Sequence, residues 1–164
     1  MSVAISQVKE KLKLLGIDFG EFYHEPIPTI DDALPVWKEI DATHCKNLFF
    51  RNHKGNRHYL VIFHYLQSLG IHELEQRLKQ GKLSFASEER MMKYLGVKPG
   101  SVSPFGLIND EAHHVHLFID KNLMQTKRIS FHPNDNSATF VLSMEGFMEF
   151  LNHTRNSYEF IDLY

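Results

Sequence analysis

The chain has 164 residues, of which 43% are hydrophobic, 12% aromatic and 23% charged, and its formal net charge is -2. This composition excludes a largely disordered chain, and the length suits one domain that buries roughly 70% of its unfolded surface. We therefore expect a single domain over residues 1–164. The near-neutral charge is not the basic excess that is typical of nucleic-acid-binding proteins.

Cys45 is the single cysteine, so no disulfide can form within the chain. No signal peptide is recognisable at the start of the sequence, and no apolar run is long enough to cross a bilayer. The expectation is therefore a protein of the reducing cytoplasm that makes no membrane contact.

The first half of the sequence predicts two helices and a β-hairpin. Apolar residues recur at helical spacing over Val3–Leu15, and Gly16 suits the end of that helix. Thr29 is a good cap for a second helix, in which Pro35 falls early, where its missing N–H costs least. Extended segments are predicted at residues 19–24, 46–52 and 59–66. A hairpin turn at residues 52–57 joins the last two.

The second half predicts helices that alternate with strands around a loop. The loop is Gly96–Leu107, which is rich in Gly, Pro and Ser. Helices are predicted at residues 71–80, 87–94 and 143–153, and strands at 114–119, 128–132, 139–142 and, at the sheet edge, 158–163. This order indicates a mixed α/β (α+β) fold with a central, mixed, largely antiparallel sheet flanked by helices.

Part of the loop, Gly100–Leu107, is a candidate binding element. Successive backbone N–H groups in such a glycine-containing turn can bind an anion or a developing oxyanion. Small side chains leave room for a small substrate, and Pro104 stiffens the approach. An ordinary surface loop between a helix and a strand explains the same composition.

Two strand ends carry further candidates. Lys46 would act as a positive charge for phosphate or carboxylate, and Asn47 could hydrogen-bond a carbonyl or a sugar hydroxyl. His132 stands before a turn, where it could donate to an ester oxygen or position a water. Solvated residues at a strand start and an exposed turn histidine are the alternative interpretations.

Cys45 invites comparison with a catalytic nucleophile because it lies between His44 and Lys46. Cationic neighbours lower the pKa of a thiol. Strand alternation argues against this role, since it places His44 and Lys46 on one face and turns Cys45 to the other, toward the core.

Metal and cofactor chemistry have little support. His113, His114 and His116 form the densest histidine cluster, and on a strand His114 and His116 would share a face. No acid or cysteine lies beside them at zinc spacing. The sequence also lacks P-loop, GxGxxG and GxSxG motifs, so we expect neither a metal nor a cofactor.

Two local clusters of basic residues stand out against the near-neutral average. They are Arg51, His53, Lys54 and Arg57 in one segment, and Arg90, Lys93 and Lys98 in another. Either cluster could face a phosphate backbone, and a solvated face is the alternative.

Three segments together resemble one family: Lys46-Asn47-Leu48-Phe49, Gly100–Leu107 and Phe131-His132-Pro133. They are similar to the pattern of the YbaK/ProX superfamily of tRNA-editing domains, and the likeness extends over nearly the whole chain. Within it, the chain looks most like the free-standing ProXp-ala deacylases. The resemblance implies hydrolysis of the ester between alanine and the terminal adenosine ribose of tRNA(Pro), in trans because no segment for amino-acid activation is present.

The resemblance also implies a role for each matching residue. Gly100 would meet the substrate carbonyl with its backbone, and Lys46 would hold the terminal nucleotide. His132 would shape the pocket and the water, with Asn47 as the companion of Lys46. The wall of a methyl-sized pocket would be formed by Ser101, Val102, Ser103 and Pro104. No general base is obvious, which fits activation of water by the ribose hydroxyl of the substrate.

The resemblance leaves the exact substrate open. A deacylase for another misacylated tRNA, such as Cys-tRNA(Pro) or Ser-tRNA, is one alternative. A non-catalytic module that grips a tRNA end or a synthetase is another. The expected partner is the acceptor end of a mischarged tRNA, with prolyl-tRNA synthetase as a further candidate, and the protein could be a monomer or a homodimer.

Overall fold

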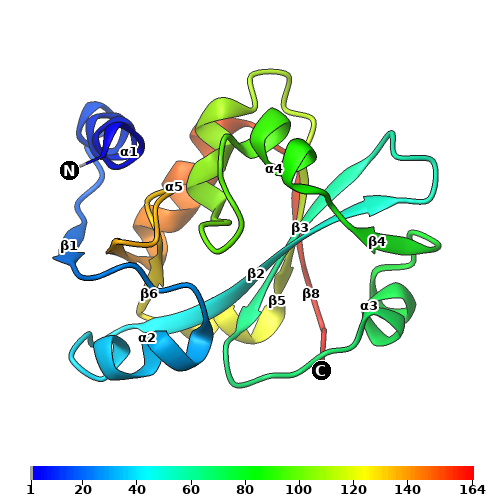
Figure 1. Ribbon diagram of the computed structural model, residues 1–164, viewed down its shortest axis with the longest axis horizontal. Coiled ribbons are helices and arrows are strands. Elements are labelled where there is room, and N and C mark those ends of the chain that lie inside the picture. Colours follow the sequence, from blue (N-terminus) through cyan, green and yellow to red (C-terminus); the bar gives the residue numbers. More distant parts are fainter. Residues whose placement is uncertain (1) are drawn as a thin grey trace.

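The computed structural model describes residues 2–164. Its strands are β1 (Gly20–Tyr23), β2 (Thr43–Asn52), β3 (His58–His64), β4 (Leu83–Phe85), β5 (His116–Asp120), β6 (Arg128–Phe131), β7 (Ala138–Ser143) and β8 (Tyr158–Ile161). They form one eight-stranded sheet in the order β1-β7-β6-β2-β3-β5-β8, with β4 paired to β2 (Figure 1). Four strand pairs are antiparallel and three are parallel. β8 is an edge strand, as its position in the sequence predicted.

Five α-helices and two 3-10 helices accompany the sheet. They are α1 (Val3–Leu14), α2 (Ile30–Trp37), α3 (Ile71–Leu78), α4 (Glu88–Leu95), α5 (Met144–Thr154), η1 (Pro104–Asn109) and η2 (Lys121–Gln125). Four of the α-helices begin after a serine or threonine whose hydroxyl accepts a backbone N–H of the first turn: Ser2, Thr29, Ser87 and Ser143. These side chains satisfy donors that a helix start leaves free, which is why the predicted starts are correct.

Pro35 lies in the second turn of α2, not at its start as the sequence suggested. Since proline has no N–H, the hydrogen bond that residue 35 would donate to the Asp31 carbonyl is lost. Ala33 is the one buried side chain of this helix. α2 is therefore a short helix with little buried surface, and its Trp37 ring stacks on His44 of β2 with 4.6 Å between the ring centres.

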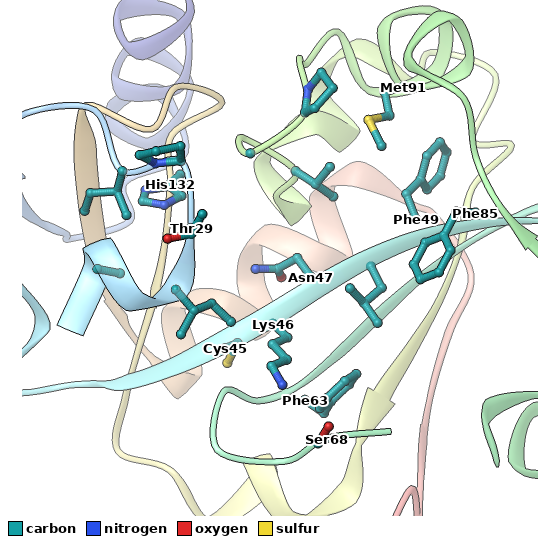
Figure 2. Close-up of a pocket in the computed structure, with 18 of the residues that line it drawn as sticks. Thr29, Cys45, Lys46, Asn47, Phe49, Phe63, Ser68, Phe85, Met91 and His132 are labelled. Atoms are coloured by element: carbon teal, nitrogen blue, oxygen red, sulfur yellow. The ribbon is translucent and has the colours of Figure 1, made fainter. Parts of the chain in front are cut away.

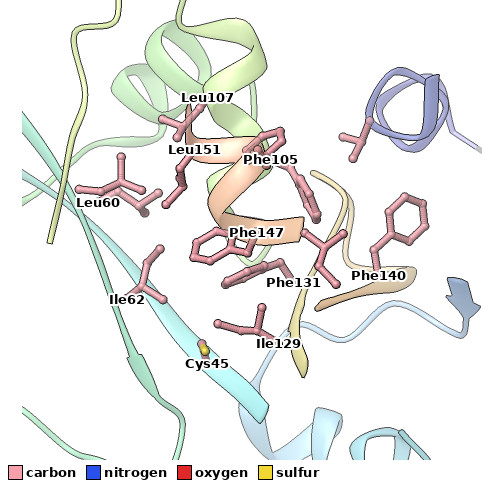
Figure 3. Packing of buried hydrophobic residues seen from close by; sticks show 14 of the residues in the cluster. Cys45, Leu60, Ile62, Phe105, Leu107, Ile129, Phe131, Phe140, Phe147 and Leu151 are labelled. Atoms are coloured by element: carbon pink, nitrogen blue, oxygen red, sulfur yellow. The ribbon is translucent and has the colours of Figure 1, made fainter. Parts of the chain in front are cut away.

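The two faces of the sheet carry separate cores. The larger core packs α1, α5 and η1 on one face, and Figure 3 shows Phe105, Phe131 and Phe147 meeting at its centre. The smaller core places Leu74 of α3 against Phe50 and other residues of the opposite face. Helices thus cover both faces of a mixed sheet, as predicted.

A gap interrupts the sheet beside β2. This strand pairs with β6 only at Thr43 and His44, and with β4 only at residues 50–52. One further bond beyond the ladder runs from the Ala86 N–H to the Phe49 carbonyl at 2.9 Å. Residues 45–48 therefore have β3 on one side and no strand on the other, and this open edge positions the candidate site.

Three local elements differ from the prediction. β4 lies in a segment for which no strand was expected, and the second half of the glycine-rich loop forms η1. His114 lies outside β5, and the preceding His113 has a φ of 53°. The expectation that His114 and His116 share a strand face is therefore wrong, because the chain turns before β5 begins.

Candidate active site

A cavity of about 480 Å³ lies at the open edge of β2. Its walls come from β2, α2, the segment around residues 99–102 and α4 (Figure 2). Five of the residues predicted for the site line it, namely Lys46, Asn47, Gly100, Val102 and His132. Segments that are far apart in the sequence therefore meet around one hollow, and its volume is typical of small-ligand sites, which span roughly 300–1,000 Å³.

Lys46 and Asn47 reach this cavity from opposite faces of β2. Successive strand residues point to opposite faces. Figure 2 shows Lys46 directed toward Phe63 and Ser68, whereas Asn47 is directed to the side on which His132 lies. The cavity therefore wraps around the open edge of β2, with a cation on one face and an amide on the other.

Asn47 has unused hydrogen-bonding capacity. Its Oδ1 atom is buried and has no hydrogen-bond partner. The main-chain carbonyl of Phe49 points away from β3, because it accepts a hydrogen bond from the Ala86 N–H on that side of β2. Alternation then directs the main-chain N–H and C=O of Asn47 to the same edge. A buried unpaired acceptor costs roughly 1–3 kcal/mol, which a donor on a ligand would recover.

The ring of His132 is oriented by one hydrogen bond. Its Nδ1 lies 2.7 Å from the Ala138 carbonyl oxygen. A carbonyl can only accept, so Nδ1 carries the proton, and Nε2 keeps its lone pair. Burial, reinforced by the nearby His24, lowers the pKa of His132 despite the bond to Ala138. His132 is therefore a neutral acceptor at the cavity at neutral pH.

Gly100 adopts a backbone conformation that favours glycine, with a φ of 85°. A Cβ atom there would lie 3.5 Å from Nδ2 of Asn136, an ordinary contact, so the constraint is conformational and not steric. Within residues 2–164 the N–H groups of Gly100 and Val102 donate to no other group. Gly100 and Val102 both line the cavity, so two unpaired backbone donors belong to its wall, where such groups can bind an anion.

The other loop residues predicted for the site do not line the cavity. Ser101 is buried and its N–H donates to the Lys98 carbonyl at 3.0 Å. The hydroxyl of Ser103, also buried, accepts from the Phe105 N–H at 3.1 Å and caps η1, in which Pro104 is the first residue. These three residues hold the shape of the loop and contribute no surface to the cavity.

Lys46 is held in place by its surroundings. Its Nζ donates to the Gln67 carbonyl at 2.5 Å and lies 5.9 Å from the centre of the Phe63 ring. Lys46 is also one of the residues that line the cavity. A fixed ammonium group here suits a phosphate or a carboxylate and does not suit a base.

Cys45 points into the larger core, as strand alternation predicted. Its side chain is buried, and burial together with the Asp120 charge raises the pKa of the Cys45 thiol well above its usual range. A protonated thiol is a poor nucleophile. This cysteine therefore has no place in covalent catalysis.

Sequence patterns do not predict which residues form the apolar part of the cavity. Met91 of α4, Trp37 of α2 and Phe85 of β4 all line it. Phe85 is 60% exposed, although the neighbouring Phe50 is fully buried. An exposed aromatic residue on a short unpredicted strand follows no periodic pattern, so only the folded chain shows its position.

Two kinds of feature are absent from residues 2–164. No helix in this range combines the length and the apolar character that a membrane span requires. No group of three or more potential ligand residues in this range is placed to hold a metal ion. His58 and His114 instead bond to each other, with 2.9 Å between Nδ1 and Nε2.

Free backbone donors, a neutral imidazole acceptor and a fixed cation around one cavity are the parts of a site that could hydrolyse an ester of a phosphate-bearing substrate. The family model of the aminoacyl-tRNA editing domain matches residues 24–150. The chain therefore belongs to the aminoacyl-tRNA editing domain family, and the predicted resemblance to the YbaK/ProX superfamily is confirmed.

Individual relatives agree with this assignment. The prolyl-tRNA editing protein ProX of Acetoanaerobium sticklandii is 40% identical over 153 residues, which are 93% of each chain. The prolyl-tRNA synthetase associated domain-containing protein 1 of Bos taurus is 28% identical, over 90% of this chain and 88% of its own. A crystal structure of a candidate trans-editing enzyme for prolyl-tRNA synthetase matches with a TM-score of 0.72 at 19% identity, covering 99% of this chain and 98% of that chain. This last match confirms the predicted fold class.

Proposed function

We propose that this protein is a trans-editing hydrolase that removes alanine from mischarged Ala-tRNA(Pro). The observation that carries the proposal is the cavity of about 480 Å³ at the open edge of β2, which Lys46, Asn47, Gly100 and His132 all line. The relative named as a prolyl-tRNA editing protein, at 40% identity, supports the choice of tRNA.

The cavity suggests how the ester would be held. The N–H groups of Gly100 and Val102, which have no partner in the described chain, would donate to the ester carbonyl oxygen and to the oxyanion that develops there. Nε2 of His132 would accept a hydrogen bond from the attacking water. The water oxygen bonds to the carbonyl carbon, the bond to the ribose oxygen breaks, and the proton lost by the water ends on that ribose oxygen, through the neighbouring ribose hydroxyl.

The size of a small side cavity supports alanine as the amino acid. This space of about 20 Å³ shares Cys45, Asn47 and His132 with the wall of the main cavity. Such a volume holds one water-sized group. A methyl group has this size and a pyrrolidine ring does not, so the side cavity would admit alanine and exclude proline.

Such size exclusion would correct an error that a prolyl-tRNA synthetase cannot avoid by itself. A pocket shaped for proline cannot strongly reject a smaller side chain, because each missing methylene is worth only about 1–3 kcal/mol. A second site that excludes the larger group removes the error. Cysteinyl and seryl groups carry one more heavy atom than alanyl, and for this reason we favour alanine over them.

The positive charges near the cavity suit the tRNA end. Lys46 would contact a phosphate of the acceptor strand. The two basic clusters of the sequence meet in space, because Nη1 of Arg90 donates to the Gly55 carbonyl at 2.9 Å and joins α4 to the hairpin turn. Exposed Glu88 and Glu89 lie on the same helix, so the surface offers a few phosphate contacts and no extended basic face.

Release of amino acids from a set of charged tRNAs tests the proposal. Purified protein should release alanine from Ala-tRNA(Pro) faster than it releases cysteine or serine from Cys-tRNA(Pro) and Ser-tRNA. The absence of alanine release at micromolar enzyme would contradict the proposal. The same proposal takes the chain as one cytoplasmic domain, with prolyl-tRNA synthetase as a candidate source of substrate.

A further inference from the structure

Phe85 stands out among the aromatic residues around the cavity. It is 60% exposed, whereas Phe49, Phe50 and Phe63 are each at most 1% exposed. It nevertheless lines the cavity. Scattered exposed apolar residues are normal on a protein surface, but an exposed ring that also lines a ligand cavity is a candidate contact surface.

The ring of Phe85 is held by its neighbours. β4 pairs with β2 so that Phe85 lies opposite Phe50, and the two ring centres are 4.7 Å apart with an angle of 35° between the ring planes. Phe50 is fully buried in the smaller core. One side of the Phe85 ring therefore rests on a rigid support, and the remainder is free to contact a ligand.

Phe85 belongs to the same face of the sheet as Lys46. Residues 46, 48 and 50 alternate onto one face of β2, and cross-strand partners such as Phe50 and Phe85 share a face. Leu48 lies between them and also lines the cavity. Position 50 is four steps along the strand from position 46, which is roughly 13 Å at about 3.3 Å per residue. A cation and an aromatic ring thus flank an apolar floor.

This spacing suits a nucleotide. The ester would occupy the other face of β2, beside Asn47 and His132, so the nucleoside that carries it must continue around the open edge. The cavity of about 480 Å³ has room for more than an alanyl group. Bases stack on exposed aromatic rings, and Lys46, farther along the same face of the sheet, offers a positive charge to a phosphate of the bound nucleic-acid strand.

We propose that Phe85 stacks against the terminal adenine of the acceptor strand and positions the ester for hydrolysis. This inference rests on the proposed function and extends it to a substrate-positioning residue. It identifies the exposed ring as a surface for a base, and a protein partner covering the same ring is the competing outcome.

A pair of small esters tests the inference without a full tRNA. One is 3′-O-alanyl adenosine, and the other is the same alanyl ester of 1-O-methylribose, which has no base. In the wild type, adenosine should raise kcat/KM relative to the base-free ester. Phe85→Leu should lower kcat/KM for the adenosine ester by about five-fold or more and leave the base-free ester unchanged, since stacking contributes roughly 1–3 kcal/mol per base. Phe85→Tyr should retain the wild-type values.

Met124→Ala provides a matched control, because Met124 is 53% exposed in η2 and does not line the cavity. Equal losses on both esters in Phe85→Leu, or no loss on either, would overturn the inference while the proposed function stands. Hydrolysis of neither ester and of no Ala-tRNA(Pro) by the wild type would overturn the proposed function, and the inference with it.

Discussion

His132 and His58 are two imidazoles that the fold shields from water and that nevertheless differ in their free atoms. Burial lowers the pKa of both, and that of His58 falls to about 4. His58 uses both ring nitrogens: Arg90 donates to its Nε2 at 2.9 Å, and its Nδ1 lies 2.9 Å from Nε2 of His114. His132 uses only Nδ1, and it lines the cavity.

The difference separates a histidine that is fully engaged in the structure from one that keeps an acceptor for a ligand. A lowered pKa is common to both and identifies neither. The free acceptor at the cavity is specific to His132, whereas the engaged ring of His58 ties α4 to β3 and to the segment before β5. We therefore expect substitutions of His132 to affect mainly activity and substitutions of His58 to affect mainly stability.

The largest expected effect is on activity at His132. His132→Ala removes the acceptor that would orient the water, and kcat for alanine release should fall by roughly 100-fold or more, within the 10²–10⁴ range of positioned acid–base groups. His58→Gln keeps a donor and an acceptor and should change kcat less than three-fold. Single-turnover release from Ala-tRNA(Pro) measures both, and equal losses would erase the distinction.

The next effect concerns stability and pH at His58. Because its folded pKa of about 4 is below the ordinary value of about 6.5, the unfolded chain binds more protons between these pH values. The contribution of neutral His58 to stability is complete above pH 6.5 and is lost as pH falls toward 4. Between pH 7 and pH 5 the free energy of unfolding should fall by about 1–2 kcal/mol more in the wild type than in His58→Gln, measured by urea titration. Identical pH dependence in both proteins would contradict this assignment.

Two glycines with a similar positive φ allow the effect of backbone conformation on stability to be distinguished from an effect on activity. Gly100 and Gly81 have φ values of 85° and 78°, and Gly81 has no atom within 4 Å of an added Cβ. Each change to alanine should cost stability by about 1–2 kcal/mol. Only Gly100→Ala should also lower kcat/KM, by roughly ten-fold, because it shifts the two N–H donors. A similar loss of activity in Gly81→Ala would remove the loop from the mechanism.

The smallest effect is a change in salt dependence at Lys46. Lys46→Met should raise KM several-fold and reduce the slope of log(kcat/KM) against log[salt] by about one, as loss of one phosphate contact predicts. Lys121→Met changes an exposed lysine in η2 and should leave the slope unchanged. An unaltered slope in Lys46→Met would assign this lysine to structure, through its bond to Gln67.

The sequence allowed the fold class and most helix starts to be predicted, because caps and apolar periodicity are local signals. It also predicted that Lys46, Gly100 and His132 would come together, and all three line one cavity. It did not predict that Lys46 would lie on the opposite face of β2 from His132. The cavity reaches both faces because β2 pairs with β6 at one end and with β4 at the other, which leaves its middle unpaired on that side. These pairings join segments far apart in the sequence, so no local pattern predicts them.

The same limit explains the details that the sequence analysis missed. Ser101 and Ser103 resemble substrate-binding residues by position, yet both are buried and form hydrogen bonds within the loop and η1. Phe85 has no polar or glycine signal, and its place at the cavity follows from pairing with Phe50. The free nitrogen of His132 and the engaged ring of His58 become distinguishable only when their partners are in place.

The central claim is that this cavity admits an alanyl ester and excludes a prolyl ester. The most direct measurement is the ratio of kcat/KM for Ala-tRNA(Pro) to that for Pro-tRNA(Pro), with the same tRNA preparation and the wild-type protein. We expect a ratio of about ten or more, since a pyrrolidine ring that does not fit the side cavity loses at least the discrimination that one or two methylenes provide. A ratio near one, or a preference for Pro-tRNA(Pro), would contradict it.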